Sequence, residues 1–313
     1  MAIFITSRSS MAANDLLTVL QNKRPCVSLN KICLFMNALK LFVLLFISNG
    51  LYAQKDSVYL WPKNIPNQTK PKSQPITTTI DDGTTRVTEV TNPFFAVFEP
   101  KKENKNNKAI VVCPGGGYVR LAVHKEGYTV ANWLTGLGYT VFVLQYRVPD
   151  NRDGALQDMQ RSLKLIRHNA KNYGIDPTKI GAMGFSAGAH VVARSGMKDS
   201  SQTYPVQDDA DAENGRPDCM IIIYPGYLDG GPNKTLTPEL KATAKTVDTF
   251  IFQAMDDAIV QSSFALAMAL RDTKANVELH LVPKGGHGFG MTPGNKAAET
   301  WPGLLASWLK DHL

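Results

Sequence analysis

The 313-residue sequence has few cysteines, no apolar stretch long enough to cross a membrane and no block of like charges. Four cysteines exclude a small fold held together by disulfides, and their spacing fits no structural zinc site. Basic residues with interleaved aromatic residues, the usual mark of a nucleic-acid groove, do not occur as a run. The 24 glycines and 18 prolines follow no period, which excludes collagen, and an apolar content of 43% excludes intrinsic disorder.

Positive charge is concentrated near the N-terminus. The formal net charge is +7, and the first 53 residues carry five basic side chains against one acid, Asp15. More than half of the net charge therefore lies in this short segment, and acids and bases are mixed along the rest of the chain. This distribution gives no indication of a nucleic-acid partner.

The N-terminal segment has the pattern of a cleavable export signal. The basic stretch 36–40 precedes the apolar run 41–47, and a polar break then leads to the small residue Ala53. Because the apolar run is far shorter than the ~20 residues that span a bilayer, the sequence predicts cleavage after Ala53 and a secreted or periplasmic protein without a stable membrane anchor. An uncleaved anchor over 32–53 is the alternative, although Lys40 interrupts it.

The chain divides into three parts. Residues 1–53 are interpreted as an N-terminal extension plus signal peptide, 54–84 as an extended, turn-rich lead-in and 85–313 as one folded domain. Met1 and Met36 are both compatible with the start of translation.

The pattern after residue 84 alternates between strand and helix. The helix over 156–173 is the clearest, because its apolar side chains recur at steps of three and four. Strands are expected at 85–90, 94–98, 109–113, 140–145, 180–185, 220–224, 249–254 and 277–282, with further helices at 126–134, from 187, at 264–271 and at the C-terminus. Apolar strands alternating with amphipathic helices imply an α/β fold with a mainly parallel central sheet, flanked by helices on both faces.

The cysteines that remain after signal cleavage are Cys113 and Cys219, each in or beside a predicted strand. In the expected sheet, one strand lies between the strands that carry the two cysteines. Because neighbouring strands are about 4.8 Å apart, two such steps place the cysteines too far apart for a disulfide. We expect both to be buried free thiols.

The first candidate for chemistry is a serine at a predicted strand end, where ligands bind in a parallel sheet. The sequence Gly-Phe-Ser-Ala-Gly at 184–188 follows a predicted strand and opens a helix. A sharp turn there exposes the Ser186 hydroxyl, and the flanking glycines allow the close packing that such a turn needs. Ser186 is therefore the candidate nucleophile, with an ordinary glycine-rich turn as the alternative.

A second glycine-rich loop, Pro-Gly-Gly-Gly-Tyr at 114–118, follows the strand expected at 109–113. Its backbone N–H groups can turn toward a substrate carbonyl oxygen and form an oxyanion hole together with the N–H of Ala187. A plain turn and a phosphate loop are the alternatives, and the phosphate loop is disfavoured because no Gly-Lys-Ser/Thr follows.

Two further strand ends carry an acid pair and a histidine. Asp256 and Asp257 follow the strand at 249–254, and either carboxylate can orient a histidine, with a helix-capping pair as the alternative. His287 lies in Gly-Gly-His-Gly after the last strand and is the candidate base. The order serine, aspartate, histidine is that of the α/β-hydrolases, and such a mechanism requires neither a metal nor an organic cofactor.

With these elements in order, the chain resembles secreted α/β-hydrolases similar to bacterial acetyl xylan esterases and BD-FAE-type feruloyl/acetyl esterases. The resemblance rests on Cys-Pro-Gly-Gly-Gly-Tyr at 113–118, His-Lys-Glu-Gly-Tyr at 124–128, Tyr-Arg-Val-Pro at 146–149, the serine motif at 184–190, Tyr224-Pro225, Asp256-Asp257 with Val260, and residues 285–290. It implies that Asp257 is the acid partner of His287. It also implies that the amides of Gly116, Gly117 and Ala187 form the oxyanion hole.

The resemblance implies a serine esterase that hydrolyses short acyl esters, acetyl above all, on a polysaccharide such as xylan through an acyl-enzyme. The expected partner is then an acylated carbohydrate, with no nucleic acid. Two alternatives stay open, namely a serine peptidase of the prolyl-oligopeptidase type and an inactive hydrolase-like binding module. The sequence does not indicate the oligomeric state.

Overall fold

The computed structural model describes residues 56–80, 85–198 and 201–313. The predicted extension and signal peptide, residues 1–53, lie outside the described residues. The strands are β1 (Asp56–Tyr59), β2 (Ile76–Thr79), β3 (Thr85–Thr88), β4 (Phe94–Phe98), β5 (Ala109–Cys113), β6 (Thr140–Gln145), β7 (Ile180–Phe185), β8 (Met220–Ile223), β9 (Thr249–Ala254) and β10 (Val277–Val282). The α-helices are α2 (Thr129–Gly136), α3 (Arg152–His168), α4 (Ala170–Tyr173), α5 (Ala187–Met197), α6 (Gln261–Asp272) and α7 (Lys296–His312).

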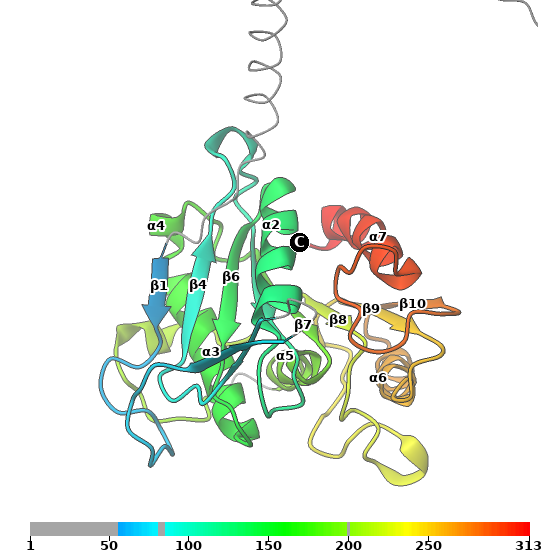
Figure 1. The fold of residues 1–313 in the computed structure, drawn as a ribbon, viewed down its shortest axis with the longest axis horizontal. Helices are drawn as coiled ribbons and strands as arrows, with labels where there is room; N and C mark the ends of the chain where they lie inside the picture. Colours follow the sequence, from blue (N-terminus) through cyan, green and yellow to red (C-terminus); the bar gives the residue numbers. More distant parts are fainter. Residues whose placement is uncertain (1–55, 81–84, 199–200) are drawn as a thin grey trace, which may run out of the picture. The chain divides into compact units, whose positions relative to one another are not determined.

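An eight-stranded sheet forms the centre of the fold, in the order β1-β4-β6-β5-β7-β8-β9-β10 (Figure 1). The strands β6, β5, β7, β8, β9 and β10 run parallel to one another. β4 is antiparallel to both of its neighbours, β1 and β6. The α/β fold with a mainly parallel sheet is thereby confirmed. Since parallel strands end at the same edge, the loops after β5, β7, β9 and β10 are brought together there.

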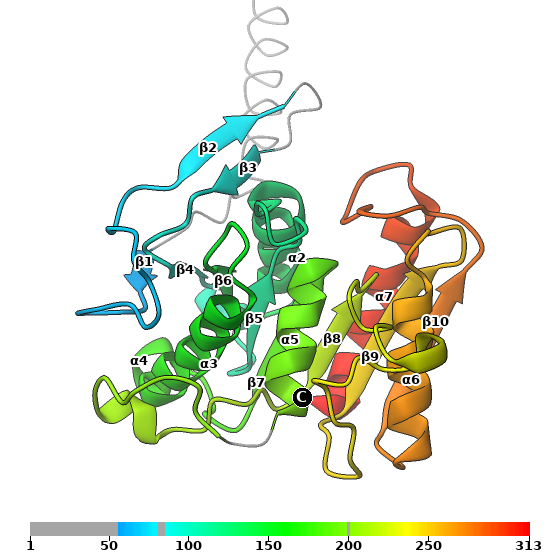
Figure 2. The same cartoon turned by 90° about the horizontal axis from the view of Figure 1, so that it is seen from below.

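Helices cover both faces of the sheet (Figure 2). Helices α2 and α7 lie on one face, where Trp133 and Trp301 meet edge-on at 5.1 Å between ring centroids. Helices α3, α5 and α6 lie on the other face. The central strands β5 to β9 are buried along their whole length, which explains why they read as continuous apolar runs rather than as alternating ones.

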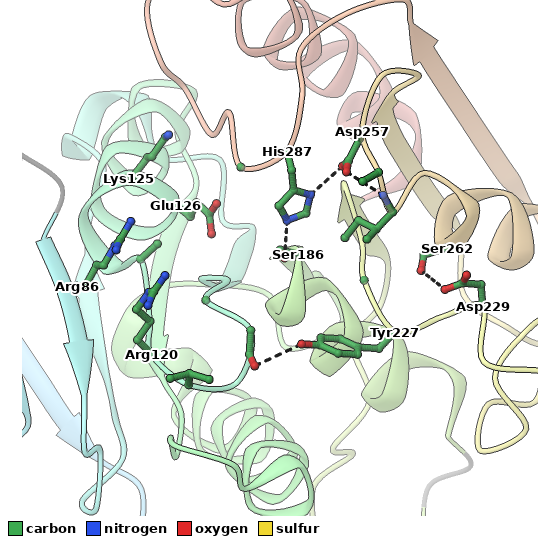
Figure 3. Close-up of a pocket in the computed structure, with 18 of the residues that line it drawn as sticks. Arg86, Arg120, Lys125, Glu126, Ser186, Tyr227, Asp229, Asp257, Ser262 and His287 are labelled. Atoms are coloured by element: carbon green, nitrogen blue, oxygen red, sulfur yellow. Dashed lines mark hydrogen bonds and ion pairs between the residues drawn. The ribbon is translucent and has the colours of Figure 1, made fainter. Parts of the chain in front are cut away.

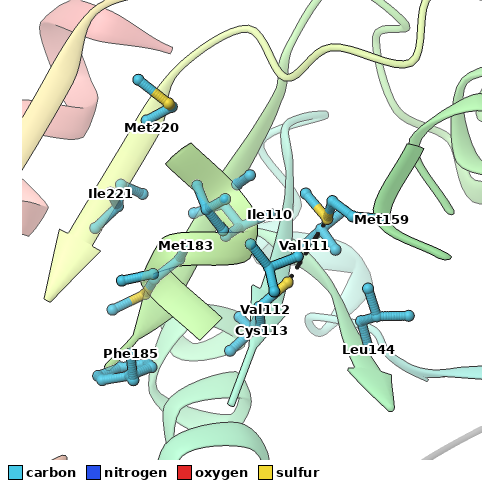
Figure 4. Packing of buried hydrophobic residues seen from close by; sticks show 14 of the residues in the cluster. Ile110, Val111, Val112, Cys113, Leu144, Met159, Met183, Phe185, Met220 and Ile221 are labelled. Atoms are coloured by element: carbon cyan, nitrogen blue, oxygen red, sulfur yellow. Dashed lines mark hydrogen bonds between the residues drawn. The ribbon is translucent and has the colours of Figure 1, made fainter. Parts of the chain in front are cut away.

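The hydrophobic core fills the space between the sheet and its helices (Figure 4). Side chains of β5 such as Val111 and Val112 pack among Met183 of β7 and Ile221 of β8, all without exposed surface. Met159 reaches the same cluster from α3, with its sulfur 3.6 Å from the Cys113 sulfur. This packing fixes the strand ends from which the candidate residues project.

The predicted helix over 156–173 ends as expected, but it has an earlier start and an interruption. It starts earlier, at Arg152, because the Asn151 side chain accepts a hydrogen bond from the Gly154 N–H at 2.8 Å and caps the helix. It divides into α3 and α4 at Asn169 and ends at Gly174, whose φ of 58° is the left-handed conformation that glycine adopts at low cost. The helix expected at 126–134 begins instead with a π-helical turn, His124–Tyr128, that leads into α2.

The segment predicted as an extended lead-in contributes to the main sheet. Strand β1 pairs with β4 along the sheet edge, and Trp61, which follows it, is buried and donates a hydrogen bond from Nε1 to Asp158 of α3 at 2.8 Å. Four residues are too few to show a periodic pattern, which is why the sequence did not reveal β1. Strands β2 and β3 form a separate two-stranded sheet.

Cys113 and Cys219 are buried free thiols, as expected, and β7 lies between β5 and β8 in the sheet. Burial raises the pKa of both thiols. Within the described ranges, no helix is long and apolar enough to span a bilayer.

Candidate active site

Ser186 lies at the sharp turn between β7 and α5. Its φ of 50° and ψ of −116° form a strained backbone conformation, as expected for a serine held out of a strand-to-helix turn. The turn tolerates only glycine at Gly188, because a Cβ there would collide with the carbonyl oxygen of Cys113. The sequence signal, two glycines around a serine after an apolar strand, thus corresponds to a real steric requirement.

His287 lies between Ser186 and Asp257 (Figure 3). Its Nε2 is 2.8 Å from the Ser186 hydroxyl, and its Nδ1 is 2.7 Å from Asp257 Oδ2. Because a carboxylate only accepts hydrogen bonds, it selects the tautomer with the proton on Nδ1. Nε2 is then left with a lone pair that faces the serine hydroxyl.

Asp257 is held in place by more than the histidine. Its carboxylate also accepts hydrogen bonds from the Ile259 N–H and the Gln253 side chain, both at 3.0 Å, and its side chain is buried. Burial acts to raise the pKa of Asp257, but the hydrogen bonds from His287, Ile259 and Gln253 outweigh it and lower the pKa below its ordinary value. The carboxylate is therefore charged at neutral pH.

Asp256 has a different set of contacts. Its side chain accepts hydrogen bonds from the N–H groups of Gly285 and Gly286 at 3.0 and 2.8 Å. It thereby fixes the backbone of the loop that carries His287 but does not contact the imidazole. The sequence left both aspartates open, and the structure brings Asp257 to the histidine.

The glycine loop after β5 lines the same pocket as Ser186 and His287. Gly116 has a φ of 137° and its carbonyl accepts the N–H of Arg120, so a Cβ at Gly116 would collide with the Arg120 backbone. This conformation leaves the N–H groups of Gly116 and Gly117 outside any described backbone ladder. Ala187 begins α5, where a first-turn N–H has no acceptor within the helix.

A buried bridge, which we call the Glu126–Tyr224 bridge, connects the glycine loop with the histidine loop. Glu126 accepts the Gly115 N–H at 2.7 Å and the Tyr224 hydroxyl at 2.9 Å. The same hydroxyl accepts the Gly290 N–H at 3.0 Å, and the Tyr224 ring lies 5.2 Å from the His287 ring. Burial raises the pKa of Glu126, against the lowering effect of its hydrogen bonds. The sequence analysis assigned neither Glu126 nor Tyr224 a role. The feature that could have indicated one is an acidic residue, Glu126, on the buried side of a helix close to the glycine loop.

His190, one helical turn beyond Ser186, contacts the glycine loop through Tyr118. It is fully buried, with Nδ1 2.8 Å from the Tyr118 hydroxyl and Nε2 3.1 Å from Glu239. Burial lowers the pKa of His190 despite the nearby carboxylate. Its contacts to Tyr118 and Glu239 make it a structural residue rather than part of the catalytic set.

Ser186, His287 and Asp257 border a pocket of about 1000 Å³, together with Gly116 and Gly117 of the glycine loop. On one side lie the cationic side chains of Arg86, Arg120 and Lys125, and on the other lie Tyr227 and Ser262 (Figure 3). The Tyr227 hydroxyl donates to the Gly117 carbonyl at 3.3 Å and so braces the glycine loop. Over the described ranges, no group of three or more His, Cys, Asp or Glu side chains is arranged to hold a metal ion.

The chain is similar to known proteins in both sequence and fold. Residues 95–221 match the BD-FAE family model. The chain is 30% identical over 234 residues to an acetylxylan esterase of Xylanibacter ruminicola, covering 66% of this chain and 46% of that protein. It is 33% identical over 211 residues to an endo-1,4-beta-xylanase B of Butyrivibrio fibrisolvens, covering 58% and 32%. The chain thus spans less than half the length of these two relatives.

Solved structures show the same fold. The crystal structure of an acetyl ester-xyloside bifunctional hydrolase from Caldicellulosiruptor lactoaceticus superposes with a TM-score of 0.67 at 28% identity, covering 84% of this chain and 98% of that one. The α/β-hydrolase MGS-M1 from a deep-sea metagenome has a TM-score of 0.58 at 23% identity, covering 76% and 96%, and supports the fold alone.

Proposed function

We propose that the protein is a serine esterase that removes short acyl groups, acetyl above all, from a polysaccharide such as xylan. The match of residues 95–221 to the BD-FAE family model and the α/β-hydrolase fold support this proposal. The observation that carries the proposal is the continuous hydrogen-bonded chain from Ser186 through His287 to Asp257. The acetylxylan esterase among the relatives supports the choice of acyl group and polysaccharide.

The first half of the reaction forms an acyl-enzyme. The Ser186 hydroxyl oxygen bonds to the ester carbonyl carbon while His287 Nε2 takes its proton, and Asp257 stabilises the resulting imidazolium. The negative charge on the former carbonyl oxygen is accepted by the N–H groups of Gly116, Gly117 and Ala187, each such donor contributing about 3 kcal/mol in comparable sites.

The second half releases the acid. When the tetrahedral intermediate collapses, the bond to the sugar oxygen breaks and His287 returns its proton to that oxygen, leaving Ser186 acylated. Water then attacks the acyl carbon, with His287 again as the base, and the free acid leaves with the serine hydroxyl restored.

Ester cleavage fits the pocket better than glycosidic cleavage does. A glycosidase needs two carboxyl groups that flank the scissile bond. Of the acids that line the pocket, Asp257 is bound to His287, Asp229 to Ser262 and Glu126 to Gly115. Each carboxylate is thus engaged in holding the protein together.

The test is acetate release from acetylated xylan, compared with release of reducing sugar from deacetylated xylan and of amine from peptide substrates. We expect acetate alone, and its loss in Ser186→Ala. Labelling of Ser186 by a fluorophosphonate separates an active esterase from a hydrolase-like binding module. Predominant peptide cleavage, or full acetate release by Ser186→Ala, contradicts the proposal.

We also propose that the protein is exported and cut after Ala53. The support is the signal-like sequence before that position, together with the start of β1 at Asp56, which leaves the sheet intact after cleavage. N-terminal sequencing of the protein recovered outside the cytoplasm is expected to begin at Gln54. Recovery of an uncleaved chain from the cell interior contradicts it.

A further inference from the structure

Three cations, Arg86, Arg120 and Lys125, line one side of the pocket and form what we call the cationic wall (Figure 3). We propose that this wall is a subsite for a carboxylate carried by the ester substrate, so that the enzyme prefers acidic esters to neutral ones. The inference rests on the proposed esterase function, since it concerns the substrate of the same site.

A short backbone pairing directs the two arginines into the pocket. Val87 of β3 and Leu121 of the glycine loop exchange hydrogen bonds at 2.9 and 2.7 Å in an antiparallel bridge. Both of these side chains are buried, so their sequence neighbours Arg86 and Arg120 point to the opposite face. That face is the pocket side, which both arginines line.

Lys125 joins the wall from the π-helical turn before α2. Its side chain lies along the histidine loop, because a Cβ built on Gly290 would be 3.1 Å from Lys125 Cγ. The Lys125 stem therefore rests against one catalytic loop, and the arginines lie beside the other. An anion on the wall would be held next to the reacting ester group.

The acids that line the pocket form no ion pair with the cations of the wall. Asp229 forms an ion pair with Lys234 at 3.6 Å on the other side of the pocket, and Asp257 is bound to His287. Glu126 is buried and interacts electrostatically with the adjacent Lys125, but its carboxylate accepts its hydrogen bonds from Gly115 and Tyr224. Over residues 56–80, 85–198 and 201–313, no ion pair joins a wall cation to a carboxylate.

An anion would stabilise this arrangement. Arg86 and Arg120 are diagonal neighbours on the same face of the Val87–Leu121 bridge, within reach of one anion, and a counter-charge between them would offset the repulsion of their like charges. A guanidinium binds a carboxylate through two parallel hydrogen bonds, and an ammonium adds a point charge. The planar carboxylate of a uronic acid on the sugar chain, or the free carboxylate of a dicarboxylic acyl group, has this chemistry.

Two matched pairs of substrates distinguish these sources. The first pair is acetylated xylo-oligosaccharide with and without a uronic acid branch, and the second is an aryl hemisuccinate and the aryl butyrate. We expect the wild type to have the higher kcat/KM for the acidic member of one pair, by about tenfold, and this preference to fall as salt is added. The pair that shows the preference identifies where the carboxylate lies.

The variants are Arg120→Gln, Lys125→Gln and their combination, with Lys310→Gln on α7 as a control for the loss of one positive charge outside the pocket. The double variant is expected to lose the acidic preference, a change on the order of tenfold in the ratio of the two kcat/KM values. Lys310→Gln is expected to keep it. Equal rates on both members of both pairs, or an unchanged preference in the double variant, overturn the proposal.

Failure of the subsite can be told apart from failure of the esterase. If neither aryl acetate nor acetylated xylan is hydrolysed and Ser186 is not labelled by a fluorophosphonate, the proposed function is wrong. Binding to Ser186→Ala then still tests the wall, by calorimetry with a uronic-acid-branched xylo-oligosaccharide and the unbranched one. The subsite is refuted if the branched and the unbranched oligosaccharide bind with equal affinity and if succinate also binds no more tightly than a neutral ligand of the size of butyrate.

Discussion

Replacing Asp257 by asparagine tests the site most directly, because it keeps the shape of the side chain and removes its charge. In the wild type, Asp257 Oδ2 lies 2.7 Å from His287 Nδ1 and selects the tautomer whose Nε2 accepts the serine proton. An asparagine amide directed at Nδ1 favours the opposite tautomer, in which Nε2 carries a proton and cannot accept another.

The size of the effect follows from the charges. When His287 becomes an imidazolium, it faces a carboxylate whose charge centre is about 4 Å away, and at an effective dielectric constant of about 20 their attraction is about 4 kcal/mol. Losing this stabilisation of the transition state lowers kcat by about a thousandfold. The wrong tautomer adds to the loss, so we expect a reduction of at least that order.

Asp256→Asn is the matched control, since it makes the same chemical change at the neighbouring residue. Asp256 accepts two backbone N–H groups with one oxygen, which an asparagine oxygen can also do. The assay is kcat on an aryl acetate, with circular dichroism to establish that both variants are folded. We expect Asp256→Asn within about tenfold of the wild type, since the exchange costs at most about one hydrogen bond. Asp257→Asn within that range, or equal losses in the two variants, refutes the assigned roles.

Three further changes test other parts of the molecule. Gly116→Ala is expected to abolish esterase activity while the fold persists, because its Cβ collides with the Arg120 backbone and displaces the glycine loop; kcat and the far-ultraviolet spectrum check this. Tyr224→Phe leaves the Glu126 carboxylate and the Gly290 N–H without the Tyr224 hydroxyl, so thermal unfolding should show a loss of about 2 kcal/mol and kcat should fall as well. The Arg161 side chain holds the pKa of Asp208 in the folded protein below its ordinary value. The contribution of Asp208 to stability is therefore complete above about pH 4, the pKa of an unperturbed aspartate, and is lost as the pH falls through the lower pKa of the folded state. The stability gap between wild type and Asp208→Asn in urea should therefore be constant at neutral pH and narrow in acid, and a gap that widens in acid contradicts this.

Much of the fold could be predicted from the sequence because its central strands are buried on both faces. Strands such as 109–113, 140–145 and 180–185 appear at the bounds that their apolar runs indicated. The serine, aspartate and histidine positions were also predictable, because each follows a parallel strand, β7, β9 or the edge strand β10, and the ends of parallel strands converge at one edge of the sheet.

What the sequence could not reveal depends on contacts between distant segments. β1 is a four-residue edge strand whose place is set by pairing with β4 and by the buried Trp61 after it. The Glu126–Tyr224 bridge joins residues 98 positions apart, and neither a helical acid nor a tyrosine after a strand indicates such a partner by itself. The choice between Asp256 and Asp257 likewise depends on which carboxylate faces the imidazole.

The bridge matters for catalysis because the working parts of the site come from separate loops. The glycine loop follows β5 and the histidine loop follows β10, and three strands, β7, β8 and β9, lie between these two strands in the sheet. Oxyanion stabilisation requires the N–H donors to be in place before charge develops, to within a fraction of an ångström. The Glu126 carboxylate accepts an N–H from the glycine loop, and the Tyr224 hydroxyl accepts an N–H from the histidine loop. Because a shift of either loop would leave a buried polar atom without its hydrogen bond, the bridge fixes the spacing of the two loops. The cost of breaking the bridge should thus appear in kcat as well as in stability, since the same displacement separates the base from the oxyanion donors.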